Sequence, residues 1–258
     1  VSTVAKTGID KLKERLISLV GVRDIETPII SDLLHEGDAV VLVVPIDKAA
    51  PKGRLILPQQ QTIREILEAR ATAVVTDEKR LGETLSLLNK EPVFIITDSQ
   101  VFKEVAAIAP KHLKLTSFSV LMARHKGILP ALTTGINAVK RLADGDTVLI
   151  AEGCTHHRQC EDIGTVKIPR WLKTFTKKDI HIETSSGMTF PQDLSPYSLV
   201  IHCGGCMLNE KEMKYRVKEA KRQLRPIVNY GILIAYMNGI LERSAEAVPE
   251  LAFLKENS

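Results

Sequence analysis

All four cysteines of the chain lie in its second half, and three of them stand beside histidines in two short motifs. The first motif is Cys-Thr-His, beginning at Cys154, and the second is His-Cys-Gly-Gly-Cys, running from His202 to Cys206. Deprotonated cysteine and neutral histidine are ligands of zinc and of iron–sulfur clusters. The pattern C-x-H…H-C-x-x-C therefore predicts a metal centre that uses both motifs.

Three interpretations of these cysteines imply different chemistry. Cysteines acting as small buried hydrophobic residues do not explain why polar His and Arg residues are interleaved with them. A structural zinc site with three cysteines and one histidine is chemically possible, but such sites usually stabilise small domains, and this chain has ample core. An iron–sulfur cluster suits the two glycines between Cys203 and Cys206, which let backbone N–H groups approach sulfur. A thioredoxin-like redox motif fits less well, because it needs no distant third cysteine.

The two motifs directly follow predicted strands. Residues 147–151 (TVLIA) precede Cys154, and residues 198–202 (SLVIH) lead into Cys203. In parallel α/β sheets, ligand sites gather at the carboxyl ends of the strands. We therefore expect the motifs to meet at one edge of a sheet, although 45 residues separate His156 from His202.

The rest of the sequence alternates between apolar runs and amphipathic stretches, which predicts an α/β fold with two domains, each a small mainly parallel sheet flanked by helices. The boundary is expected near Ser117. Further strands, buried on both faces, are predicted at 39–44, 73–75 and 93–96, and a short strand at 180–183. Helices are predicted at 9–20, 61–70, 78–88, 117–126, 132–142, 210–224 and 227–241. Another is expected to begin at an N-cap at Ser99 and to end before Pro110. Pro226 marks the first turn of the helix at 227–241.

Composition excludes several classes of protein. The chain has 258 residues, of which 44% are hydrophobic and 26% charged, as in an ordinary folded protein rather than a disordered or fibrous one. A net charge of +4 is too small to indicate nucleic-acid binding. Apolar runs such as 39–46 are far shorter than the roughly 20 residues that span a membrane, and we expect no signal peptide. Four cysteines in a chain of this length do not predict a disulfide scaffold.

The motifs also carry a family resemblance. The sequences EGCTHH (152–157), KIPRW (167–171) and HCGGC (202–206) resemble the cluster-binding signature of the HydF family of [FeFe]-hydrogenase maturation scaffolds. The resemblance extends to PIDKAAPKGRLILPQQQTIRE (45–65) and FSVLMARHKG (118–127), and covers the chain from about Thr27 onward.

The resemblance implies a division of the chain. In this family a GTPase domain is followed by a dimerisation domain and a [4Fe–4S] domain. We therefore expect residues 1–26 to be a remnant of the GTPase domain and its linker, 27–117 the dimerisation domain, and 118–258 the cluster-binding domain. The sequence contains no G-x-x-x-x-G-K-[ST] phosphate loop, so we expect no GTP binding and no enzymatic activity from this chain.

The resemblance further implies a role as carrier. Cys154, Cys203 and Cys206 would hold a [4Fe–4S] cluster. The protein would receive a transient diiron precursor bearing CO and cyanide from radical-SAM maturation enzymes and deliver it to apo-[FeFe]-hydrogenase. It would work as a homodimer in an anaerobic cytoplasm, with no nucleic-acid or membrane partner.

Three cysteines leave one iron of such a cluster without a thiolate. Glu161 is the first choice of fourth ligand, because a carboxylate is a hard, easily displaced ligand of iron. His156 and His202 follow; either could bind iron or orient a thiolate by hydrogen bonding. Cys160 lies outside the family motif and is expected to be a spectator rather than an alternative ligand.

Two other functions remain open from the residues alone. An iron–sulfur electron-transfer or redox protein would use the same thiolates but prefer four tightly bound ligands. A zinc-stapled interaction module is the second alternative. The basic stretches 167–178 and 211–225 fit ordinary solvated helices, or else docking of an acidic partner or charge compensation of an anionic cluster.

Overall fold

The computed structural model describes residues 1–2, 4–5, 7–20, 27–46, 55–153, 162–187, 189–205 and 208–254. They form two four-stranded sheets in which every strand pairs parallel to its neighbours, so the predicted α/β class is confirmed. The first sheet has the order β2-β1-β3-β4 and the second the order β6-β5-β7-β8. The strands of the first are β1 (Ala39–Val43), β2 (Thr72–Thr76), β3 (Phe94–Thr97) and β4 (Lys114–Ser117). Those of the second are β5 (Thr147–Ala151), β6 (His181–Ser185), β7 (Leu199–His202) and β8 (Ile227–Asn229).

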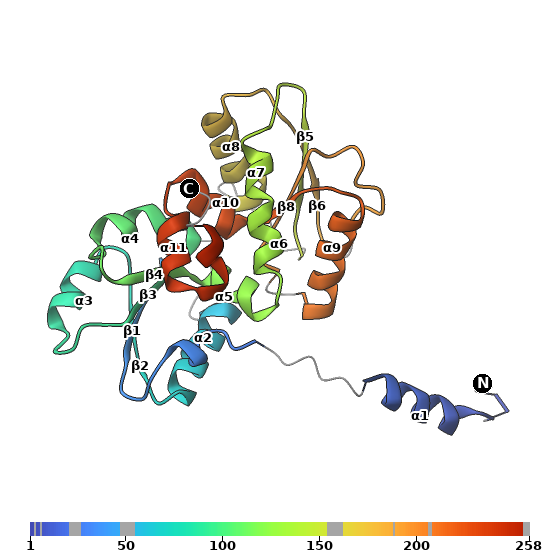
Figure 1. Cartoon of the computed structure of the whole chain (residues 1–258), viewed down its shortest axis with the longest axis horizontal. Coiled ribbons are helices and arrows are strands. Elements are labelled where there is room, and N and C mark those ends of the chain that lie inside the picture. The colour runs from blue at the N-terminus through green and yellow to red at the C-terminus, as the bar shows by residue number, and fades with distance from the viewer. Residues whose placement is uncertain are drawn as a thin grey trace.

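Helices connect the strands and cover the sheets (Figure 1). In the first half they are α1 (Ile9–Val20), α2 (Leu57–Glu68), α3 (Leu81–Leu87), α4 (Phe102–Ile108) and α5 (Phe118–His125). In the second half they are α6 (Leu129–Thr134), α7 (Ile136–Val139), α8 (Ile168–Thr176), α9 (Glu210–Arg222), α10 (Tyr230–Met237) and α11 (Leu241–Ala247). Short 3-10 or π turns complete the set: η1 (Ser31–Leu33), η2 (Ser99–Val101), η3 (Ile163–Lys167) and η4 (Pro249–Leu254). None of the helices described is long and apolar enough to cross a membrane.

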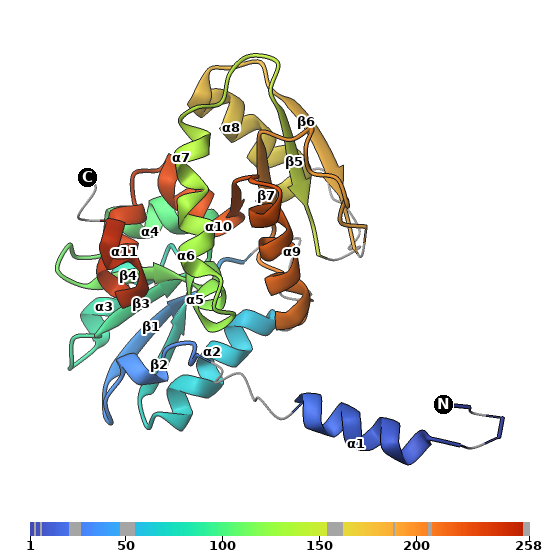
Figure 2. The ribbon, with the colours of Figure 1, turned by 45° about the vertical axis from the view of Figure 1, so that its right-hand side comes forward.

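The two sheets share one continuous apolar core. Helix α10 is buried on all sides and packs against helices of both halves, so it lies between the sheets (Figure 2). Helix α11 packs on β4 of the first sheet, although it follows the second sheet in sequence. Helix α1 stands apart from both sheets in the two views.

The carboxyl ends of the two sheets face each other. Ser99 and Ser119, which follow β3 and β4, are hydrogen-bonded to one another at 3.1 Å, and a side chain built at Gly231, after β8, would overlap Ser119. The Lys167 Nζ atom donates to the Gln100 side-chain oxygen at 3.0 Å and adds a second connection. Residues that follow the strands of either sheet therefore gather in one region.

Several predicted elements differ from the observed ones because of tertiary contacts. A helix was predicted at 227–241, but its first residues form strand β8. The Val200 N–H donates to the Pro226 carbonyl at 2.9 Å, and this bond places the chain beside β7. The predicted helix at 132–142 is two short helices, with Gly135 packed against the Ile227 backbone. Strand β4 was not predicted.

Two local predictions were also wrong. Asp98, not Ser99, caps the turn that precedes α4, and the Ser99 hydroxyl bonds to Ser119 instead. The strand at 72–76 is not buried on both faces: it is an edge strand, and Val75 is 48% exposed. The inner strands β1, β3 and β7, by contrast, are buried throughout.

A half-buried carboxylate attaches the segment before the first sheet to α2. The Glu65 side chain accepts backbone N–H bonds from Ile29, Ile30 and Ser31 at 2.8–3.0 Å. Burial by itself raises the pKa of Glu65, but these three bonds outweigh burial and hold the pKa below its usual 4.5.

We therefore expect Glu65→Gln to reduce the free energy of unfolding by about 2–3 kcal/mol at neutral pH, since the carboxylate is a stronger acceptor than the amide. Because the folded pKa lies below the unfolded one, this stabilisation is present above pH 4.5 and is lost as the pH falls below it. Urea unfolding of both proteins at pH 7 and below pH 4 measures this difference. A gap that stays constant with pH would contradict the assignment.

Candidate functional site

The structure describes part of the predicted metal site. Cys203 and His202 lie within the described residues. The other predicted site residues, Cys154, His156, Glu161 and Cys206, are outside them, as is Cys160, the predicted spectator. Within the part of the chain that is described, no three His, Cys, Asp or Glu side chains are grouped to hold a metal ion.

The two motif-bearing segments meet at the carboxyl ends of adjacent strands. β5 and β7 pair side by side, with Ala151 opposite His202, and the Cys203 N–H donates to the Ala151 carbonyl at 2.9 Å. Two residues beyond the end of β5, the Gly153 N–H donates to the Cys203 Sγ atom at 3.0 Å. The residue that precedes Cys154 is therefore in direct contact with Cys203.

The Cys203 sulfur has a second backbone donor. The Gly205 N–H points at the Sγ atom from 3.4 Å, and the side chain itself is half-buried. Gly205 has φ +61°, and a Cβ atom there would come within 2.5 Å of the buried Met213 sulfur, so both conformation and space require glycine. Two N–H groups aimed at one sulfur stabilise negative charge on it, as a metal-binding thiolate requires.

His202 is fully buried, and both of its ring nitrogens have protein partners. Nε2 lies 3.1 Å from Nη1 of Arg216, and Nδ1 lies 2.7 Å from the Cys203 carbonyl. Because a guanidinium can only donate, Nε2 is the acceptor and Nδ1 carries the proton. The pKa of His202 is lowered to about 4, chiefly by burial; the bond to the Cys203 carbonyl opposes this shift, and the charges of Arg216 and Lys126 add to it. In this arrangement the neutral imidazole orients the backbone of Cys203.

Arg216 connects three segments around this histidine. Its buried guanidinium also donates to the Glu212 carboxylate and to the Gly187 carbonyl, both at 2.8 Å, and lies 5.0 Å from the centre of the Phe190 ring. In the sequence, Arg216 is one of the cations of the basic stretch 211–225 and was not predicted as a site residue. The available signal was its register: it shares the apolar stripe of α9 with buried Met213, Val217 and Ala220.

A second buried cation reaches the site from the first half of the chain. Lys126, at the end of α5, is only 6% exposed, and its Nζ atom donates to the Gly205 carbonyl at 2.6 Å. No sequence pattern indicated this contact, which joins residues 79 positions apart.

A carboxylate and a phenol lie at the end of β5. Glu152 is 2% exposed, and the Tyr230 hydroxyl donates to it at 3.3 Å. Burial and then the Glu152 charge raise the pKa of Tyr230. A side chain at Gly164 would overlap both groups. Gly153 directly follows Glu152 in sequence, and Gly164 lies against the Glu152 side chain. Both ends of the segment between these glycines are therefore at the site.

Comparison with known protein families adds to this geometry. A family model described as the hydrogen maturase F dimerization domain matches residues 29–127, which contain the first sheet. A second model, described as the hydrogen maturase F tetramerization domain, matches residues 130–247, which contain the second. A search of curated proteins gives no match.

Proposed function

Since the chain belongs to the hydrogen maturase F family, we propose that its part in hydrogenase maturation is that of a [4Fe–4S] scaffold for the diiron subcluster. The observation that carries this proposal is the environment of Cys203. Its sulfur accepts two backbone N–H groups, and two buried cations, Arg216 and Lys126, lie at the same loop. A neutral, inert cysteine needs none of these features.

The described residues fit an anionic cluster. N–H groups directed at a cysteine sulfur and nearby positive charges both stabilise the negative charge of iron–sulfur centres. Cys154 and Cys206 would supply the other two thiolates. When bound, such a cluster supplies an iron whose weakly held ligand an incoming metal complex can replace.

The cargo would be a diiron complex bearing CO and cyanide. On the family resemblance, radical-SAM maturation enzymes supply this complex and apo-[FeFe]-hydrogenase accepts it. The protein's own residues would hold the cluster and keep one coordination position exchangeable. That makes this chain a carrier rather than a catalyst.

Anaerobic reconstitution with iron and sulfide tests the proposal. We expect a brown protein with about four iron and four sulfide ions per chain, and an EPR signal on reduction that added cyanide changes. Zinc bound without sulfide would support an interaction module instead. A cluster whose spectrum does not respond to cyanide would support an electron-transfer protein.

The fourth ligand gives a further prediction. Glu161 immediately precedes Asp162, from which the chain returns to Glu152 through Gly164. Glu161→Ala should retain the cluster but change its EPR spectrum, because a displaceable carboxylate would be lost. Cys160→Ala is the matched control and should leave the spectrum unchanged. The reverse result would indicate a closed site with four cysteines and would favour electron transfer.

Assembly gives another prediction, since both matched models are named for oligomer formation. β2 is one of the two edge strands of the first sheet (Figure 1). The backbone N–H of Thr72 and the backbone carbonyl of Thr76 bond to residues that flank β1. Successive residues of a strand direct their backbone groups to opposite sides, so those of Val75, next to Thr76, point away from β1. An outward strand edge is a surface on which a second copy can pair.

Val75→Pro should therefore lower the molar mass measured by light scattering, because proline removes the outward N–H group. Val75→Thr keeps that group and is the matched control. An unchanged mass for the proline variant, with the fold intact by circular dichroism, would place the interface elsewhere.

A further inference from the structure

Lys126 makes a contact that ties the two matched domains together at the cluster loop, defined here as Cys203–Cys206. Its ammonium donates to the Gly205 carbonyl at 2.6 Å, and the Leu208 N–H donates to the same oxygen at 3.0 Å. Lysine is rarely buried to this extent, because removing an ammonium group from water is costly. A buried lysine does not contribute to solubility, so the position of Lys126 beside the glycine-containing loop requires another explanation.

The backbone holds Lys126 in place. Helix α5 ends with two bonds of a Schellman motif, from Gly127 N–H to the Arg124 carbonyl at 2.8 Å and from Ile128 N–H to the Ala123 carbonyl at 3.0 Å. Gly127 has φ +65°, as this motif requires. His125 is fixed as well, since its Nδ1 atom lies 2.6 Å from the Thr27 carbonyl.

The loop is therefore held at two of its carbonyls, those of Cys203 and Gly205. His202, itself held by Arg216, bonds to the carbonyl of Cys203, and Lys126 bonds to that of Gly205. With Gly205 fixed, its N–H group stays directed at the Cys203 sulfur. Lys126 also places a positive charge near the anion that the loop would bind.

We propose that Lys126 is a positioning residue by which the dimerization domain fixes the cluster loop of the neighbouring domain and sets the reduction potential of the bound cluster. The statement about potential rests on the proposed function, whereas the statement about the loop does not. A fixed positive charge favours the reduced, more negative state of a cluster. Replacing Lys126 by an apolar residue of similar length should thus both loosen the loop and make the potential more negative.

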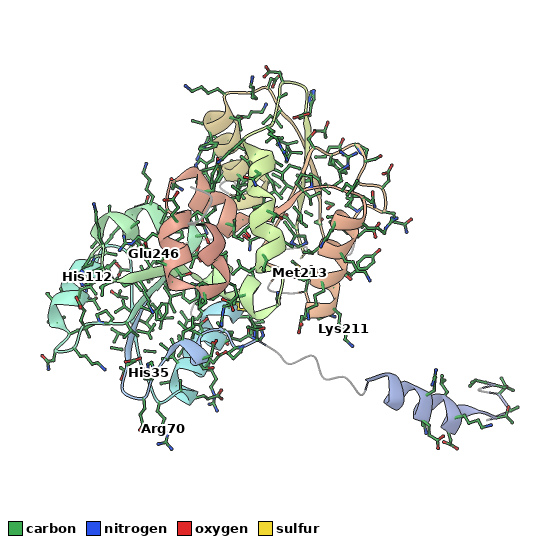
Figure 3. The ribbon with its side chains drawn as sticks, viewed as in Figure 1. His35, Arg70, His112, Lys211, Met213 and Glu246 are labelled. Carbon is green, nitrogen blue, oxygen red and sulfur yellow. The ribbon has the colours of Figure 1, made fainter. Side chains whose placement is uncertain are left out.

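The first experiment uses the protein without metal. Hydrogen exchange of the peptide that contains residues 203–208 should be faster in Lys126→Met, by about fivefold or more, and close to wild type in Lys126→Arg. Lys211→Met is the matched control, because Lys211 is an exposed lysine of α9, on which Figure 3 labels both it and Met213. Unchanged exchange in Lys126→Met would overturn the positioning role.

The second experiment uses the reconstituted protein. We expect a more negative midpoint potential and an altered EPR spectrum for Lys126→Met, with near wild-type values for Lys126→Arg and Lys211→Met. An unchanged potential for Lys126→Met would overturn the electrostatic role. If wild type binds no cluster, the proposed function fails, while the exchange experiment still decides the loop contact. Lys126→Gln serves both experiments if the methionine variant does not fold.

Discussion

Cys203→Ala is expected to fold but to lose most of its iron and acid-labile sulfide after reconstitution. The thiolate supplies an anionic bond to iron that alanine cannot replace. The fold should survive, because the side chain is half-buried and its removal costs only two N–H···S contacts, about 1 kcal/mol each. Metal analysis and the visible spectrum, with circular dichroism as a check of folding, measure the loss.

Cys160→Ala is the matched control, since it removes one cysteine from the same protein without touching the family motif. Cys154→Ala and Cys206→Ala should behave like Cys203→Ala. Full retention of iron and sulfide by Cys203→Ala would remove this residue from the ligand set and with it the structural basis of the proposed function.

Arg124→Met should lower the free energy of unfolding by about 2–4 kcal/mol. The Arg124 side chain is 4% exposed, and its guanidinium bonds to the Asp32 and Glu250 carboxylates and to the Pro28 carbonyl. These partners lie before β1 and after α11, at positions far apart in the sequence. Removing the arginine leaves two carboxylates without their cation, which costs more than losing an exposed pair.

Arg64→Met is the matched control for urea unfolding. Arg64 pairs with Glu68 on α2 at 2.6 Å, but both side chains are more than half exposed, so its loss should cost at most about 0.5 kcal/mol. For a protein of ordinary stability, about 5–15 kcal/mol, the Arg124 effect is large. Equal effects of the two substitutions would show that the bonds of buried Arg124 do not stabilise the fold.

The sequence by itself determined the α/β class, the inner strands and the region in which the chemistry lies. Runs such as 40–43 are short, apolar at every position and rich in β-branched valine, which favours a strand covered on both faces. The cysteine motifs come directly after two such strands. Because parallel neighbours end at the same sheet edge, the contact between Gly153 and Cys203 follows from order along the chain.

The tertiary structure alone decided the elements whose local signals were ambiguous. Residues 227–229 belong to an apolar run compatible with helix or strand, and the bond from Val200 to Pro226 selects the strand. β2 is as rich in valine as an inner strand, but strand order places it at an edge and exposes Val75. Such choices depend on neighbours that are distant in sequence.

The same distinction separates the two parts of the candidate site. Ligand chemistry is carried by residue type and short spacing, so the cysteines and histidines were recognisable at once. Arg216 and Lys126 resemble ordinary surface cations in the sequence, and only folding buries them beside His202 and Gly205. A buried charge is stable only where polar atoms of the protein form hydrogen bonds or ion pairs with it. Those atoms are brought together by tertiary packing and not by a local sequence pattern.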